Sequence, residues 1–253
     1  MEIKLQKITT HTNELDAKVN VFLKKTALQN VYESFYEKIH EHCNEFGKTL
    51  EIGSASGKSK DSFKNIFLSD VVFSHHSDTV CDAHFLPFKN KNFSNIIAID
   101  TFHHLENPLM FVKEASRILT NGGRMALIEP LVTPISQIVY KFFHDEDCST
   151  NINPFQINAV DQKRNPLKDG NNGLPTAFFL KKKDSFHKKF PALKIVKFQR
   201  LSLFVYPLTG GYRNWCLMPS LLVKSLLKVE NFLLPLLGRL MALRMLVVIE
   251  KRK

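Results

Sequence analysis

The sequence predicts an α/β fold built around a mostly parallel sheet. A short strand is expected at 48–53, and apolar runs at 95–100 and 124–129 flank a helical pattern at 108–119, which is the rhythm of βαβ units. The runs suit buried parallel strands, and Asn-Gly-Gly at 121–123 suits a helix stop. With 253 residues, 44% of them hydrophobic and 23% charged, the chain has the composition of a globular protein and not of a disordered or fibrous one.

The segments around this core are predicted from their periodicity and turn residues. The expected elements are a helical segment over 13–46 that ends near Gly47, a helix after the turn at 53–57, a strand at 71–73, a short helix at 181–190, a strand at 193–205, a helical stretch over 218–243 and a final strand at 245–250. Pro235 is expected to kink or split its helix. Residues 144–175 are rich in Asn, Asp, Gly and Pro without a clear period, and we expect them to form a mobile lid.

The positive charge of the chain is concentrated at one end. The net charge is +11, but residues 1–180 carry −2 and residues 181–253 carry +13. Such an end indicates either an anionic partner, such as lipid, nucleic acid or a phosphorylated substrate, or lysines solvated at a surface. The stretch 218–243 sets a basic stripe beside a broad apolar face. That pattern fits a helix in a membrane interface, and it also fits a helix packed on the sheet or in a dimer seam.

Cysteine spacing and hydropathy exclude several other classes. The four cysteines lie far apart and show no zinc-ligand spacing, so we predict no metal site and a reduced, cytoplasmic setting. The first residues contain no signal-peptide pattern. The most apolar stretch, 201–223, is interrupted by glycine, arginine and proline, so we predict no transmembrane helix.

A turn of small residues follows the first strand. Residues 50–57 read LEIGSASG, which lets the backbone approach a ligand closely and offers free N–H groups at a helix start. The glycine spacing differs from that of nicotinamide-dinucleotide sites, and no acid closes the strand expected at 71–73. Downstream lie CDAHFLPF at 81–88, FHHL at 102–105, NGG at 121–123 and IEP at 128–130.

This ordered set of motifs resembles the class I S-adenosylmethionine-dependent methyltransferases of the type 11 group. The resemblance covers about residues 48–130 and implies a Rossmann-like sheet, mostly parallel, with an antiparallel last strand next to 124–129 and a helical and loop cap. The expected divisions are an N-terminal helical segment at 1–47, a cofactor-binding core at 48–130, a lid or cap insertion at 131–192, and the last two strands with inserted basic amphipathic helices at 193–253.

The resemblance also assigns the cofactor-binding residues. These are Glu51, Gly53, Ser54, Ala55, Gly57, Ser74, Asp82, Ala83, Asp100 and Thr101. Ala55 replaces the second glycine of the family, which requires a negative φ. Ser74 stands where the family has an acid that holds the ribose hydroxyls, so cofactor binding is expected to be weakened. The chain from Asp70 to Asp82 is too short for a full crossover, and we expect the third strand and its helix to be short or missing.

Three residues at strand ends are candidate catalytic residues. His103 and His104 suit proton removal because neutral imidazole titrates near pH 7, and Glu129 follows the fifth strand toward the expected cleft. The alternative is that these side chains orient a loop or pack at the strand end. The acidic turn at 144–146 is interpreted as solvated, with substrate or metal contact as the alternative.

The predicted function is therefore methyl transfer from S-adenosylmethionine to a small-molecule, glycan or lipid acceptor. The alternative is a non-catalytic, methyltransferase-like scaffold in a complex or at a membrane, which the missing ribose acid favours. We expect a cytoplasmic protein whose residues 218–243 contact the inner face of the membrane peripherally. A nucleic-acid partner is disfavoured, because the basic end has no recognisable RNA-binding module.

Overall fold

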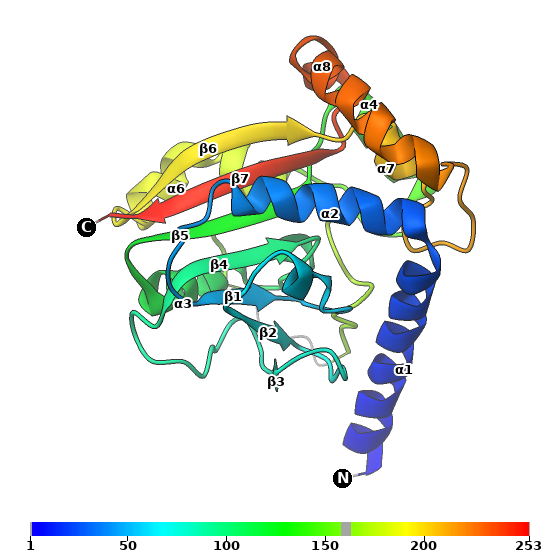
Figure 1. Cartoon of the computed structure of the whole chain (residues 1–253). Coiled ribbons are helices and arrows are strands. Elements are labelled where there is room, and N and C mark those ends of the chain that lie inside the picture. The colour runs from blue at the N-terminus through cyan, green and yellow to red at the C-terminus, as the bar shows by residue number, and fades with distance from the viewer. Residues whose placement is uncertain (1, 158–162, 253) are drawn as a thin grey trace.

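A seven-stranded sheet forms the centre of the molecule. The computed structural model describes residues 2–157 and 163–252, and its strand order is β3-β2-β1-β4-β5-β7-β6 (Figure 1). The strands are β1 Thr49–Ile52, β2 Ile66–Asp70, β3 Thr79–Val80, β4 Phe93–Ile99, β5 Leu119–Pro130, β6 Leu193–Leu201 and β7 Arg244–Lys251. The five adjacent strands β3, β2, β1, β4 and β5 run parallel to one another, whereas β7 is antiparallel to both of its neighbours.

The antiparallel last strand is confirmed. β7 lies next to β5, with Arg124 opposite Glu250 and Glu129 opposite Met245. Successive residues of these two strands enter different cores, because strand side chains alternate between the two faces of a sheet. Met125 and Leu127 join one core cluster, and Ala126 and Ile128 join the other.

Helices cover both faces of this sheet. They are α1 Glu2–Lys24, α2 Thr26–His40, α3 Pro108–Ile118, α4 Pro134–Phe143, α5 Leu174–Thr176, α6 Lys183–Lys189, α7 Val205–Leu208 and α8 Val223–Met241, with short turns at Lys58–Asp61, Phe102–His104, Ala177–Lys181 and Ser220–Leu222. α2 packs on one face and α3 on the other, while α1 stands at the edge where the parallel strands end (Figure 1). The buried rings of Phe178, Phe179 and Phe186 join the α3 side, so residues 174–179 and Phe186 of the expected cap lie in the core, whereas Lys181 to Asp184 are exposed.

Several expected elements are corrected. The N-terminal segment is two helices that meet at Lys25, and the turn at 53–57 leads into a four-residue 3₁₀ turn and not into a full helix. Residues 121–123 lie inside β5, which begins directly after α3, so they do not stop that helix. α8 continues through Pro235 and is not split.

The second strand lies five residues before its expected position. β2 is Ile66–Asp70, paired with β1 from Thr49↔Ile66 onward, and the apolar triplet 71–73 follows it. Val71 and Phe73 are half exposed, so their apolar character does not mark a buried strand here. β3 has only two residues, and residues 71–78 form no helix, which confirms that this crossover is reduced.

Candidate active site

A cavity of about 1270 Å³ lies at the carboxyl ends of β1, β2 and β4. Ligands of open α/β sheets bind outside this edge, at the point where the strand order reverses. Here the reversal falls between β1 and β4, which pair with each other. β2 and β3 are added on the outer side of β1, whereas β5 is added on the outer side of β4. α1, α4, the segment 206–215 and residues 144–146 and 164–169 of the expected lid supply further parts of the wall, so the first helix of the chain takes part in the site.

The turn after β1 forms one end of the cavity. Gly53 has φ +74°, and a Cβ at this position would lie 2.2 Å from Thr101 Oγ1, so only glycine fits. Ala55 has φ +39°, contrary to the negative φ that we expected. Two side chains hold it: the Ser74 hydroxyl donates to the Ala55 carbonyl at 3.0 Å, and Asp70 Oδ2 accepts from the Ala55 N–H at 3.0 Å.

Asp70 is the acid that the sequence analysis missed. It is the last residue of β2, it is buried, and it lines the cavity, whereas Ser74 lies behind the turn and is not part of the wall. Burial raises the pKa of Asp70, although hydrogen bonds from the backbone at Ala55 and Val72 oppose the shift. The expectation that no acid closes the second strand is therefore wrong. The run Ile-Phe-Leu-Ser-Asp at 66–70 was the signal that could have located it.

Asp82 and Ala83 line the same end of the cavity. Asp82 Oδ1 accepts from the backbone N–H of His84 at 2.9 Å and lies 2.6 Å from His84 Nδ1. Partial burial raises the pKa of Asp82, but the contacts with His84 outweigh this and lower it. Asp82 is thus held as a half-exposed carboxylate.

Glu51 lies away from the cavity wall. Its carboxyl group is buried between α2 and the turn, where it accepts hydrogen bonds from the hydroxyls of Tyr36 and Ser59. Burial raises the pKa of Glu51 to about 8, against the opposing effect of these two hydrogen bonds.

Glu51→Gln is expected to change how stability depends on pH. The folded protein holds the Glu51 proton up to about pH 8, whereas the unfolded chain releases it near 4.5. The free energy of unfolding contributed by Glu51 therefore falls between pH 4.5 and 8, by up to about 1.4 kcal/mol per pH unit. Urea unfolding at pH 5 to 8 should show a flatter profile for Glu51→Gln. The exposed Glu37→Gln is the control, and a variant profile parallel to the wild type would contradict the prediction.

An arginine–tyrosine cluster forms the opposite wall. Asp100 follows β4 with φ +52°; its Oδ1 lies 3.2 Å from Arg244 Nε, and its Oδ2 accepts from the Tyr32 hydroxyl at 3.0 Å. Arg244, at the start of β7, also donates to the hydroxyls of Tyr206 at 2.9 Å and Tyr140 at 3.3 Å. All of these residues line the cavity and Arg244 is buried. The cluster gives this end of the site a fixed array of charges and hydroxyl groups.

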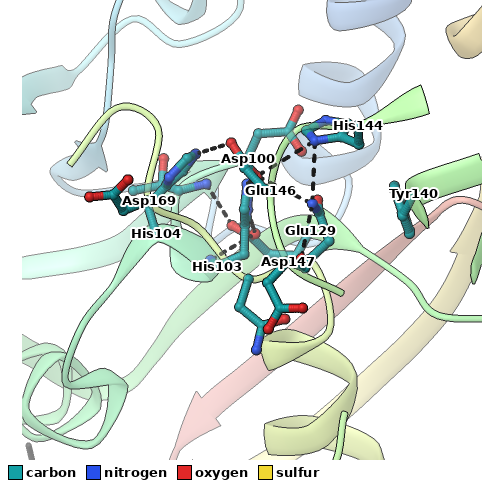
Figure 2. A network of polar contacts seen from close by, with 12 residues as sticks. Asp100, His103, His104, Glu129, Tyr140, His144, Glu146, Asp147 and Asp169 are labelled. Carbon is teal, nitrogen blue, oxygen red and sulfur yellow. Dashed lines mark hydrogen bonds and ion pairs between the residues drawn. The ribbon is translucent and has the colours of Figure 1, made fainter. Parts of the chain in front are cut away.

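Glu129 orders the loop that carries the two histidines. Its Oε1 accepts from the backbone N–H groups of Thr101 at 2.8 Å and Phe102 at 2.7 Å, and its Oε2 lies 2.8 Å from His103 Nδ1 (Figure 2). The carboxylate is fully buried and is not part of the cavity wall. Glu129, a candidate catalytic residue, therefore contacts residues 101–103 from outside the cavity wall.

Glu146 meets three imidazoles. Its Oε2 lies 3.3 Å from His103 Nε2 and 3.8 Å from His144 Nδ1, and its Oε1 lies 3.6 Å from His104 Nε2 (Figure 2). The Glu146 side chain is 11% exposed and that of Asp145 is 99% exposed. The prediction that this acidic turn is solvated is therefore confirmed for Asp145 and wrong for Glu146. Sequence spacing does not find this group, because its members come from separate segments.

The pKa values of this group diverge. Burial lowers the pKa of His103, but its contacts with Glu129 and Glu146 outweigh burial and raise it to about 9. Burial raises the pKa of Glu146, but the three histidines outweigh burial and lower it to about 2. Burial, together with the charge of His103, holds the pKa of His104 well below its usual range.

Comparison with known proteins identifies a matching domain and a similar fold. Residues 50–127 match a family model described as a methyltransferase domain. A SAM-dependent methyltransferase from Archaeoglobus fulgidus matches with a TM-score of 0.52 and 10% identity, over 88% of this chain and 94% of that one. Among curated protein sequences, none matches this chain.

Two further structures have lower scores. One, from Thermotoga maritima, is a SAM-dependent methyltransferase described as a possible histamine N-methyltransferase; its TM-score is 0.49 at 15% identity, over 93% of this chain and 96% of that one. The other is geranyl diphosphate C-methyltransferase from Streptomyces coelicolor in complex with Mg²⁺, geranyl diphosphate and S-adenosyl-L-homocysteine, with a TM-score of 0.46 at 13% identity, over 88% and 80%.

Residues 50–127 thus match a methyltransferase domain, and the Rossmann-like sheet has the fold of an S-adenosylmethionine-dependent methyltransferase. The cofactor of this class is S-adenosylmethionine. The residues fit it, because Gly53 leaves a backbone cradle that a Cβ would fill and Asp70 presents a carboxylate to the cavity. Along residues 2–157 and 163–252, no helix has the length and hydropathy needed to span a membrane.

Proposed function

We propose that this methyltransferase acts on a small organic acceptor held beside the cofactor in the cavity at the strand ends. The observation that carries the proposal is one continuous space of about 1270 Å³ between the turn at 53–56 and the arginine–tyrosine cluster. Typical ligand pockets measure about 300–1,000 Å³, so the space is large enough for a cofactor and a second molecule together.

The turn end of the cavity is assigned to the cofactor. Gly53, Ala55, Asp82 and Ala83 line it, and Asp70 takes the ribose-binding role that the sequence analysis gave to Ser74. The other residues that were predicted to bind the cofactor lie outside the cavity wall, where they support the turn; they are Glu51, Ser54, Gly57 and Ser74. S-adenosylmethionine supplies a methyl group on an activated sulfonium. The protein then has mainly to place the acceptor in line with it.

The opposite end is assigned to the acceptor. Asp100, which was expected to bind the cofactor, lines the cavity there together with His103 and His104, and contact of the two histidines with the acceptor is a proposal. Thr101 adjoins Gly53 and keeps its expected place at the cofactor end. Glu129 acts through His103 and is a positioning residue. With Asp70 present, the reason for preferring a non-catalytic scaffold disappears.

Asp70→Asn tests the cofactor site. A carboxylate that accepts from both ribose hydroxyls makes two charge-assisted hydrogen bonds, each worth roughly 1.5–3 kcal/mol, so the variant should bind S-adenosylmethionine about 10- to 100-fold more weakly. Isothermal calorimetry measures the affinity, and thermal melts check folding. Asp184→Asn, on the exposed part of α6, is the control. Equal affinities for Asp70→Asn and wild type would remove Asp70 from the site, and a wild type that does not bind at millimolar concentration would leave only the scaffold.

We further propose that the acceptor has an apolar part and reaches the site from a membrane surface. Large apolar side chains are exposed on α4, α8 and the chain before α8, namely Ile138, Phe142, Phe143, Leu208, Trp215, Leu217, Leu221, Leu222, Val229, Phe232, Leu236 and Leu240. Phe143, Leu208 and Trp215 also line the cavity. One side of α8 packs on the core through Val223, Leu226, Leu227, Leu233, Leu234, Leu237 and Met241. Its other side leaves Val229, Phe232, Leu236 and Leu240 exposed. Exposed Lys224, Lys228 and Arg239 add the charge that anionic lipid attracts.

Vesicle co-sedimentation at low and high salt tests this surface. Binding to anionic vesicles should partly survive high salt, because salt screens the charges but not the apolar burial. Phe232→Ser should weaken it about tenfold, the value of one large apolar side chain. Phe46→Ser is matched in exposure, at 81% against 82% for Phe232, and should bind like the wild type. Equal losses for both variants, or a stable dimer in light scattering, would contradict a membrane surface.

A further inference from the structure

The polar atoms around Glu146 satisfy one another only in part: Glu146 Oε2 accepts from Asn172 Nδ2 at 3.3 Å and lies 3.3 Å from His103 Nε2. The contacts from its carboxylate to His104 Nε2 and His144 Nδ1, at 3.6 and 3.8 Å, are too long for hydrogen bonds. The ligand atoms of His103, His104 and Glu146 all lie within 4.8 Å of one another. In a tetrahedral site with bonds of about 2.0–2.1 Å, neighbouring ligand atoms are about 3.3–3.4 Å apart. The 3.3 Å between His103 Nε2 and Glu146 Oε2 already has this value.

The support behind His103 is a further observation that points to a bound ion. Glu129 holds His103 through Nδ1 at 2.8 Å, which leaves Nε2 directed at Glu146. A carboxylate behind an imidazole is the arrangement that orients histidine ligands of metals. His104 lacks such a support, since its Nδ1 has no hydrogen-bond partner among the described residues, and its Nε2, 3.6 Å from Glu146 Oε1, is the atom that it offers to an ion.

We propose that His103, His104 and Glu146 bind a divalent transition-metal ion, with His144 next to them as a further ligand. Two imidazoles and one carboxylate form the ligand set of open zinc and non-haem iron sites, whereas magnesium and calcium prefer oxygen ligands alone. All four side chains line the cavity. Since Glu146 belongs to the expected lid, the ion would also fasten the lid to the loop after β4.

The position of the site suggests what the metal does. It faces the acceptor end, so an open coordination position would take an oxygen or nitrogen of the acceptor and lower its pKa. This last step rests on the proposed function, but ion binding does not. The Lys18 ammonium, which donates to the Leu167 carbonyl at 2.6 Å and lies near Glu146, opposes the ion with one charge. The carboxylates of Glu129 and Glu146 offset it.

Direct metal measurements on the untagged full chain test the site. After treatment with a chelator and dialysis against Zn²⁺, mass spectrometry should find one zinc per chain, and X-ray absorption should show nitrogen and oxygen ligands without sulfur. Competition with a chromophoric chelator should show affinity at least 100-fold lower for Glu146→Gln and His104→Asn. His76→Gln, in the exposed His75-His76 pair, is the matched control and should keep the wild-type affinity.

Three results would overturn the inference: less than one tenth of a zinc per chain in the wild type, sulfur in the X-ray absorption spectrum, or equal affinity in folded Glu146→Gln. Circular dichroism of each variant identifies a folding failure, and the wild-type spectrum decides the ligand set without any variant. Calorimetry of S-adenosylmethionine with the metal-free protein separates the two proposals. Cofactor binding without zinc binding removes only the metal site, and zinc binding without cofactor binding removes only the proposed function.

Discussion

Replacing Glu129 with alanine is expected to lower the free energy of unfolding by about 3–5 kcal/mol. The Glu129 carboxylate accepts from the backbone of Thr101 and Phe102 and contacts His103 Nδ1, all at a site without solvent exposure. Alanine would leave these donors buried without an acceptor. Urea denaturation followed by fluorescence or circular dichroism measures the loss.

Two controls separate this effect from the loss of any carboxylate. Glu129→Gln keeps one oxygen for the backbone N–H groups and should cost less than alanine. Glu250→Ala removes a half-exposed partner of Arg124, 2.9 Å away, and should cost at most about 1 kcal/mol. A Glu129→Ala protein within 1 kcal/mol of the wild type would mean that solvent replaces the carboxylate and that the loop is not fixed by it.

Arg244→Met is expected to have an effect of similar size, about 3–5 kcal/mol, because it breaks a buried ion pair by removing one partner. The Asp100 carboxylate would stay buried with only the Tyr32 hydroxyl, and the guanidinium would no longer lie over the Tyr206 ring, 4.6 Å from its centre. Urea denaturation measures this loss too. Arg239→Met, on the exposed side of α8, should change stability by no more than about 0.5 kcal/mol.

A double-mutant cycle identifies the cause. Asp100→Asn removes the charge that Arg244→Met leaves unpaired, so the double variant should be more stable than the sum of the two single losses predicts. Additive losses would mean that the arginine stabilises the protein through packing on Tyr206 and its hydrogen bonds, and that the 3.2 Å contact with Asp100 contributes nothing.

The sheet could be predicted from local patterns. Long segments with a clear pattern predict β4, β5 and the helix between them. The antiparallel β7 was predicted from the resemblance to methyltransferases. The pattern failed at β2, because Val71-Val72-Phe73 has strong strand propensity and yet lies past the sheet. Pairing with β1 decides the register, and this tertiary contact overrides propensity. The misplaced strand then hid Asp70.

The acceptor end could be predicted only in part. His103 and His104 were found because they adjoin a strand end, but Glu146 comes from a segment without periodicity, and Asp100 and Arg244 are 144 residues apart in sequence. Arg244 reaches Asp100 only when β7 is paired in the assembled sheet, and no spacing in a single sequence indicates that contact. The same holds for α1, whose Leu15, Lys18 and Val19 line the cavity.

The place of β7 in the sheet has a consequence for biosynthesis. β6 pairs with β7 and with no other named strand of the described chain, so it has no partner until residues 244–251 have left the ribosome. During that interval the outer edge of β5 is also unpaired, and open edges of this kind are where nascent chains associate wrongly. Arg244 is the first residue of β7, so the cavity gains this cation in the same step in which β7 inserts between β5 and β6. A chain stalled before residue 244 is therefore expected to need a chaperone and to lack the acceptor end of the site.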